Sequence, residues 1–335
     1  MIRHLKKLKT EQTGETLIIV ALALTALIGI AALVVDIGKA YVRTAELQSA
    51  ADAAVMAAGL QLPVDANDAI ALQQVRASAI EYLGKNGIDD TSGVEVYLDE
   101  LKQGRYFRIG VRAQATTQMG FARIFGLKQI TFARAAEART IPCIMLSDVV
   151  PLSVKESVLE GLIASGATKH VVLKYGKKTD EVVGGSFGAI DLDGVKGGGA
   201  NDYRSWLANG YQGNLSVGDT LPVESGNMVG PTLSGISTRY NSCVHNKSCG
   251  GCNAEKYEPD CPRVMKVPVV RYTGCGNKYV EIVGFAAFVL EDYTTYSSQG
   301  YVIGTYVDMV NVGAAGGDLT GTAENYGVYS LTLSK

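Results

Sequence analysis

The stretch TLIIVALALTALIGIAALVV, from Thr16 to Val35, decides how this chain is organised. It contains no charged residue, and about 20 apolar residues in an α-helix span the hydrocarbon core of a bilayer. A cleaved secretory signal has an apolar run of only about 7 to 15 residues before a small-residue cleavage site, whereas this longer run ends directly at Asp36. We therefore predict one uncleaved transmembrane helix; the alternative is a buried core helix of a soluble protein.

The charges on the two sides of this span differ. Basic residues precede it at Arg3, Lys6, Lys7 and Lys9, while Asp36 and a segment of mixed charge follow it. Basic flanks are preferentially retained in the cytoplasm. The asymmetry predicts a single-pass protein of the cell membrane with its N-terminus in the cytoplasm and its C-terminal domain, about 300 residues long, outside.

The next segment, IGKAYVRTAELQSAADAAVMAAGL from Ile37 to Leu60, is rich in strong helix formers and contains no proline. The helix is therefore expected to continue outward, and only Gly38 could bend it. Ala50, Ala54 and Ala58 recur every fourth residue and form a stripe on which another helix, or a second copy of the chain, could pack closely. Ordinary helix propensity explains the same alanines without any partner.

This segment resembles the N-terminal signature of the TadE/TadG-like family of Flp (tight adherence) pilus-assembly proteins. That signature is an apolar helix, Asp-x-Gly, an aromatic residue and Leu-Gln-x-Ala-Ala-Asp-Ala-Ala. The matching residues are Asp36, Gly38, Tyr41, Leu47, Gln48, Ala50, Ala51, Asp52, Ala53 and Ala54. Three later stretches, GSFGAIDLDG, SVGDTLPVESGNMVGPTLSGI and CPRVMKVPVV, are similar to the extracellular part of TadG-like proteins from Gram-positive bacteria.

The resemblance implies a membrane-anchored, non-catalytic component of Flp-type pilus or surface-structure assembly. Its implied partners are the membrane and other pilus-assembly or surface proteins. Some members of the family also carry a von Willebrand type A domain, whose metal site requires an Asp-x-Ser-x-Ser motif. This sequence lacks that motif, so no metal site is carried over.

Beyond the first helix, the residue pattern predicts an α+β fold. A second helix is expected from Val64 to Gly87, and alternating apolar and polar residues in GVEVYLDE, RYFRIGVRAQATTQ and QITFARAAEART then predict strands. FARIFGL, which separates the last two stretches, is expected to form a short helical turn. Together these elements predict an antiparallel sheet backed by helices.

The amino-acid composition changes near Ile141. Glycine, tyrosine and strand-like runs dominate after this residue, so a β-rich domain is expected. Within that domain, DYRSWLANGY predicts a short helix that ends at Gly210 and buries Trp206. The predicted divisions are a basic cytoplasmic leader (1–15), the transmembrane helix (16–35), an α+β juxtamembrane domain (36–140) and a β-rich extracytoplasmic domain (141–335).

Six cysteines are the most concentrated reactive groups of the sequence. They are Cys143, Cys243, Cys249, Cys252, Cys261 and Cys275, of which five lie in the loop 243–275 together with His245. An exported location favours disulfides, so we expect these cysteines to be paired with one another. The CxxC spacing of Cys249 and Cys252 is also found in zinc sites, but the second CxxC pair of a zinc ribbon is missing.

Composition restricts the possible functions. The 31 Lys and Arg residues balance 33 Asp and Glu residues, so no overall charge attracts nucleic acid, which we do not expect as a partner. With 3 histidines and no GxSxG, HExxH or phosphate-binding loop, the sequence offers no catalytic constellation, and we expect no enzyme activity, cofactor or metal site. Two alternatives to an assembly component stay open: a surface-displayed binding module or adhesin, and an exported thiol or zinc enzyme.

Overall fold

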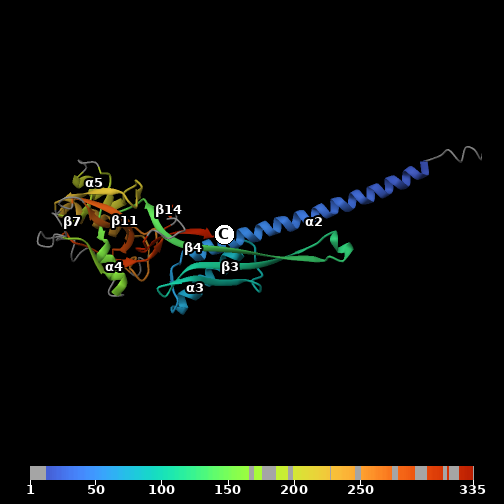
Figure 1. Cartoon of the computed structure of the whole chain (residues 1–335), viewed down its shortest axis with the longest axis horizontal. Coiled ribbons are helices and arrows are strands. Elements are labelled where there is room, and N and C mark those ends of the chain that lie inside the picture. The colour runs from blue at the N-terminus through green and yellow to red at the C-terminus, as the bar shows by residue number, and fades with distance from the viewer. Residues whose placement is uncertain are drawn as a thin grey trace, which may run out of the picture.

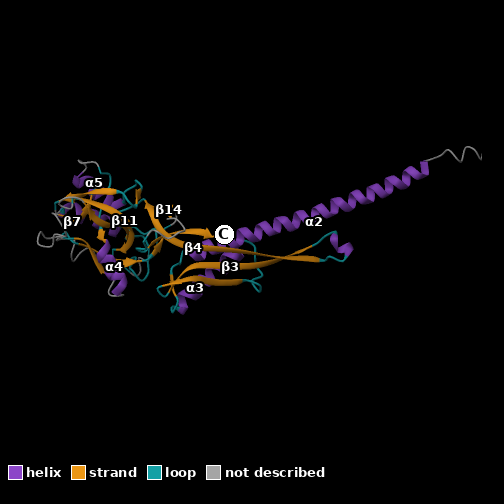
Figure 2. Ribbon diagram, viewed as in Figure 1, coloured by secondary structure: helices purple, strands orange, loops and turns teal. Residues whose placement is uncertain are grey.

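A long helix projects from a body made mainly of strands (Figures 1 and 2). This computed structural model describes residues 13–165, 170–175, 186–194, 199–226, 228–245, 250–273, 278–290, 300–311, 315–316 and 324–334. Positions 1–12 of the predicted basic leader (1–15) and two of the six cysteines, Cys249 and Cys275, lie outside the described residues. The predicted α+β fold, with a long N-terminal apolar helix and a β-rich C-terminal region, is confirmed.

The N-terminal part combines two helices, a short 3₁₀ helix and an antiparallel sheet. Its elements are α2 (Thr13–Gly59), β1 (Val64–Asp65), α3 (Ala69–Lys85), β2 (Glu95–Lys102), β3 (Arg105–Gln118), η1 (Ala122–Phe125) and β4 (Gln129–Leu146). The first half of α2 is exposed, and the second half packs on β3, β4 and α3. Buried Leu47 and Val55 of α2 share one core with Val75 of α3 and Ile109 of β3.

The alanine stripe of α2 packs against the chain's own sheet and α3. Ala50, Ala54 and Ala58 are fully buried in this core, against the sheet and α3. Small side chains let the axis of a helix approach a sheet closely, so these alanines set how near α2 lies to its own strands. Self-association through α2 stays a proposal, and it would have to use another face of the helix than the one these alanines occupy.

The second helix begins later than expected. Val64 and Asp65 pair with Tyr106 and Arg105 as strand β1, which holds the start of the predicted helix in an extended conformation. Asp68 then caps α3, since its carboxylate accepts hydrogen bonds from the backbone N–H groups of Ile70 (3.1 Å) and Ala71 (3.0 Å). A capping aspartate supplies acceptors for N–H groups at the first turn, so the helix starts there.

The C-terminal part contains a second sheet with helices packed on it, and also strands that extend the sheet of the N-terminal part. Its elements are β5 (Val154–Lys155), α4 (Glu156–Ser165), β6 (His170–Lys174), β7 (Ser186–Ile190), α5 (Gly199–Asn209), β8 (Leu215–Ser216), β9 (Thr220–Ser225), α6 (Val229–Asn241), β10 (Val264–Thr273), β11 (Tyr279–Val289), β12 (Val302–Val307), β13 (Met309–Val310), β14 (Ala315–Gly316) and β15 (Val328–Ser334). The second sheet has the strand order β5-β10-β11-β12-β6, with β9 also paired to β11, whereas β8, β13, β14 and β15 belong to the sheet of β3 and β4. The central strands β10 and β11 are buried along most of their length, as expected for the middle of a core.

Strands β4 and β15 join the two parts of the molecule. The first half of β4 pairs with β3, residues 137–142 pair with β15, and its end pairs with β8 and β14. The last strand of the chain therefore completes a sheet that begins with residues of the N-terminal part. The predicted domain division at residue 141 stays a prediction, and one continuous strand runs through it.

Candidate functional site

The first feature of functional interest is the apolar half of α2. Large side chains of this half face outward along its length, including Leu17 (72% exposed), Leu27 (63%) and Ile28 (62%). An apolar surface of this size is not stable in water, and it indicates contact with lipid or with another apolar surface. The helix is long and apolar enough to cross a membrane.

Asp36, the first residue after this apolar run, is buried and binds the tip of the β3–β4 hairpin. Its carboxylate accepts hydrogen bonds from the backbone N–H groups of Gly120 (2.8 Å), Phe121 (2.9 Å) and Ala122 (2.7 Å). These groups lie at the start of η1, where N–H donors have no partner within the short helix. The bond from Ala122 contributes most to lowering the pKa of Asp36 below its ordinary 3.8, although burial acts in the opposite direction.

The hairpin is thereby held alongside α2 at the level where the apolar run ends (Figure 1). A second contact lies beside the first, because the Nζ of Lys39 donates to the backbone oxygen of Gln118 at 3.2 Å. The tip itself carries exposed apolar side chains: Ile124 is 81% exposed and Phe125 is 88% exposed. The sequence predicted the helical turn here, but it did not predict that this turn returns to the base of the apolar helix.

Replacing Asp36 with asparagine is expected to loosen the hairpin tip. Asparagine keeps one acceptor oxygen and no charge, so three N–H groups lose a shared anionic acceptor. We expect hydrogen exchange at Gly120 to Ala122 to become about ten-fold faster or more. Asp52→Asn is the matched control, because Asp52 accepts its hydrogen bond from Gln48 on the same helix and contacts no hairpin residue through it. Unchanged exchange in Asp36→Asn would contradict the assigned role.

The same contact should depend on pH at acidic values. Because the pKa of Asp36 is lower in the folded chain than its ordinary 3.8, the carboxylate stabilises the hairpin contact above that value. This contribution is expected to disappear as the pH falls below about 3.8 toward the folded-state pKa. The Asp36→Asn variant should lack this part of the pH dependence.

The remaining signature residues of the sequence fall into two sets. Leu47, Ala51 and Ala54 are buried against the sheet, Ala53 is half-buried, and the Nε2 of Gln48 donates to Asp52 at 2.8 Å. Gly38 and Tyr41 are exposed, and Tyr41 is 75% exposed. The signature thus combines residues that dock α2 on its sheet, one residue that fastens the hairpin tip, and an exposed aromatic side chain near the end of the span.

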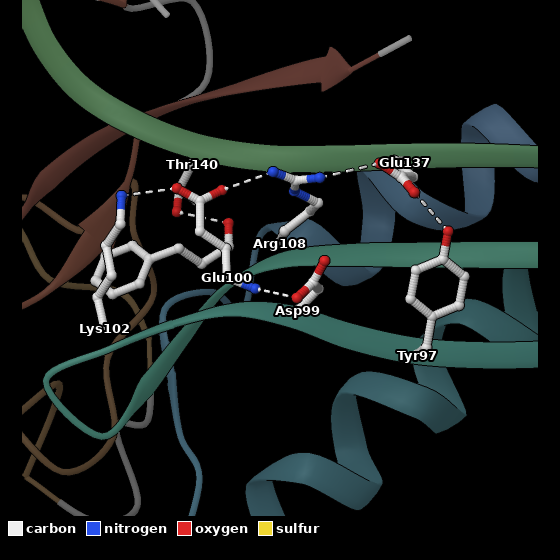
Figure 3. Close-up of polar contacts among 8 residues, drawn as sticks. Tyr97, Asp99, Glu100, Lys102, Arg108, Glu137 and Thr140 are labelled. Atoms are coloured by element: carbon white, nitrogen blue, oxygen red, sulfur yellow. Dashed lines mark hydrogen bonds and ion pairs between the residues drawn. The ribbon is translucent and has the colours of Figure 1, made fainter. Parts of the chain in front are cut away.

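A charged network lies on the face of the sheet opposite α2 (Figure 3). Arg108 joins two carboxylates, Glu100 at 3.3 Å and Glu137 at 3.4 Å, and Lys102 pairs with Glu100 at 2.7 Å. The hydroxyl of Tyr97 donates to Glu137 at 2.6 Å, and burial together with this bond raises the pKa of Tyr97 to about 12. Each of these charges has an opposite partner, so the network fixes the register of β2, β3 and β4 and offers no activated group.

The cysteines that the structure describes divide into one isolated residue and one cluster. Cys143 is buried in β4, its thiol donates to the backbone oxygen of Met145 at 3.1 Å, and burial raises its pKa to about 11. Cys243, Cys252 and Cys261 converge with His245, and their ligand atoms lie within 4.8 Å of one another. No disulfide joins the four described cysteines, and the predicted pairing of all six stays a prediction.

Comparison with known families identifies the N-terminal segment. Residues 14–66 match the family model described as Flp pilus-assembly TadE/G-like, so the predicted resemblance is confirmed over the apolar helix and its continuation onto the sheet. No curated protein and no solved structure matches the chain. The match covers the span, Asp36 and the alanine-rich half of α2, and it ends shortly after β1.

Proposed function

We propose, from the TadE/G-like segment at residues 14–66, that the chain is a membrane-anchored, non-catalytic component of a Flp-type pilus or related surface-assembly system. The observation that carries this proposal is the exposed apolar helix Thr16–Val35, which lies entirely within the matched segment. The lipid bilayer would cover this surface, and the body after Asp36 would stand on the outer side. A non-catalytic role is supported by the charged network of the sheet, where Lys102, Glu100, Arg108 and Glu137 each have an oppositely charged partner.

Protease treatment of intact cells tests the anchor and the orientation together. Cells should express the full chain with one epitope tag before Met1 and another after Lys335. We expect external protease, applied after removal of the cell wall, to destroy the C-terminal tag while the N-terminal tag stays protected in the membrane fraction. Protection of both tags in cells without the wall, whose membrane is intact, would contradict the orientation. Release of the full chain by alkaline carbonate would contradict the anchor.

Pilus formation tests the assembly role separately from the anchor. Deletion of the gene in its native host is expected to abolish surface fibres, and expression of the full chain should restore them. A deletion strain with normal fibres would remove the assembly function, even if the protease experiment supported the anchor. Counting fibres by electron microscopy gives the measurement.

The hairpin tip is expected to touch the outer surface of the same membrane. Asp36 fixes the tip beside the end of the span, and exposed Ile124 and Phe125 would otherwise face water there. Aromatic side chains favour the membrane interface, and Arg123 and Lys128 beside them could contact lipid phosphates. In this arrangement the body of the protein is held to the bilayer at two points, which limits how far it can tilt.

A tryptophan placed at the tip tests this contact. The full chain with Phe125→Trp is reconstituted into vesicles with brominated lipids, which quench tryptophan fluorescence on contact. We expect the fluorescence of this variant to be quenched, whereas that of the parent chain, which contains Trp206 alone, should not be. Val158→Trp is the matched control, because Val158 is 47% exposed on α4 in the C-terminal part. Equal emission of the Phe125→Trp chain in brominated and ordinary lipids would contradict the membrane contact.

The exposure of the tyrosines in the C-terminal part bears on the alternative of a surface-displayed binding module. Tyr203 and Tyr329 are only 1% exposed, and Tyr306 and Tyr326 are buried as well, whereas Tyr279 at the start of β11 is 45% exposed. The four buried rings fill the core and are therefore not available to a partner.

A further inference from the structure

A compact group of metal-ligand side chains lies between α6 and β10. Cys243 follows the last turn of α6, Cys261 precedes β10, and His245 and Cys252 come from the intervening loop. The three cysteines are buried, and the ligand atoms of all four residues lie within 4.8 Å of one another. The sequence places His245 in the same loop as these cysteines, but neither the CxxC spacing nor the spacing of a zinc ribbon marks it as a ligand.

The orientation of His245 points to a ligand inside this group. Its Nδ1 is buried and has no hydrogen-bond partner in the described part of the chain, whereas its Nε2 lies 3.9 Å from the Oδ1 of Asp260. A buried ring nitrogen without a partner is costly, and binding a metal would satisfy it. Histidine ligands of metals commonly direct their second ring nitrogen toward a carboxylate, which is the place that Asp260 occupies.

The distances suit a tetrahedral ion. The Sγ atoms of Cys243 and Cys261 are 3.4 Å apart. Sulfurs bound to one tetrahedral zinc at about 2.3 Å are separated by about 3.7 Å, so only a small adjustment is required. Three thiolates and one imidazole form a ligand set that favours zinc. Calcium and magnesium prefer oxygen ligands.

The loop around the group is held in place by an arginine. The guanidinium of Arg263 stacks on Tyr240 at 3.6 Å and donates hydrogen bonds to the backbone oxygens of Gly250 (3.0 Å) and Cys252 (3.1 Å). A side chain at Gly251 would meet this guanidinium, since a Cβ there would lie 2.6 Å from it, and Gly251 also has a φ of +96°. The loop is therefore built to bring Cys252 to the cluster in one conformation.

We propose that Cys243, His245, Cys252 and Cys261 bind one structural zinc ion, with Nδ1 as the histidine ligand. All four protein positions of a tetrahedral site are filled by side chains, which is the pattern of a structural and not a catalytic zinc site. The ion fastens the loop between α6 and β10 to the core of the C-terminal part. Pairing of these same thiols as disulfides is the competing state, and the experiment below separates the two.

The first measurement is the metal content of the full chain, purified in mild detergent without chelator or added metal. Elemental analysis is expected to find one zinc ion per chain, released when an organomercurial blocks the thiols. Cobalt exchanged into the chain should produce the visible absorption of a tetrahedral thiolate site. A chain without metal, in which thiol-blocking reagents add mass only after reduction, would overturn the proposal.

Variants locate the ion. Cys261→Ser is expected to reduce bound zinc at least ten-fold, whereas Cys143→Ser, which alters another buried cysteine outside the cluster, should keep it. His245→Cys should retain the ion with a four-sulfur cobalt spectrum, and His245→Ala should hold it more weakly. Zinc that stays at one per chain in both Cys261→Ser and His245→Ala would place the ion elsewhere and overturn the assignment. If Cys261→Ser does not accumulate, the zinc content of His245→Cys and His245→Ala and the cobalt spectrum still test whether the ion is bound at this cluster.

Discussion

Replacing both Leu24 and Ile28 with arginine is expected to remove the chain from the membrane fraction. Both residues lie near the middle of the span, and they are 53% and 62% exposed. Exchanging one such side chain for arginine at the centre of a bilayer costs about 3 to 4 kcal/mol on the scale of translocon insertion, so two exchanges cost on the order of 6 to 8 kcal/mol. This is larger than any effect we expect elsewhere in the chain. Membrane fractionation after carbonate treatment gives the measurement.

The double variant Ala45→Arg and Ser49→Arg is the matched control. It adds the same two charges at the same spacing, on the same helix, at exposed positions beyond the end of the span. It should remain in the membrane fraction at the level of the parent chain. If both double variants stay membrane-bound, the anchor is not Thr16–Val35. If both double variants are missing from the membrane fraction, the added charges act through folding or transport and not through the span.

Replacing Tyr329 with alanine should have the second largest effect, this time on stability. Tyr329 is 1% exposed in β15, its ring packs edge-to-face on Phe107 of β3 at 5.8 Å, and its hydroxyl lies 3.4 Å from the Oδ1 of Asp308. Truncating a buried aromatic ring to alanine costs about 3 to 5 kcal/mol. The variant should therefore unfold at a clearly lower urea concentration, measured on the full chain in mild detergent.

Tyr329→Phe separates the ring from the hydroxyl. It keeps the packing on Phe107 and removes the contacts of the hydroxyl with Asp308 and Asn325, while Asp308 stays paired with Arg105 at 2.9 Å. We expect a loss of about 1 kcal/mol or less in the free energy of unfolding. If Tyr329→Phe is as unstable as Tyr329→Ala, the hydroxyl, and not the ring, joins the two parts of the molecule.

Local patterns were sufficient for much of the fold. The helix expected in DYRSWLANGY is present as α5, Trp206 is half-buried there against the core, and Gly210 ends it with a φ of +79°. The hairpin strands and the turn between them also follow the expected stretches. These features depend on neighbours within a few residues, where periodicity and turn-forming residues carry the information.

Other features could not be predicted from local patterns. Strand β1 replaced the start of the second helix because Val64 and Asp65 found partners about 40 residues away in β3. The alanine stripe was open to an external partner in the sequence, and the chain's own sheet covers it. The sequence placed His245 in the cysteine-rich loop, but only the meeting of α6, the loop and β10 decides that it lies beside Cys243, Cys252 and Cys261.

The sequence by itself determined the apolar span, its continuation as one helix, the α+β class and the TadE/G-like segment. Each of these is written in consecutive residues, because hydrophobic length and helix propensity act along the chain. The tertiary structure decided that Asp36 fastens a hairpin tip 84 to 86 residues away, that β15 returns to complete the sheet of β4, and that three thiols and an imidazole converge. Such contacts depend on how distant segments pack, and no local pattern in one sequence specifies that.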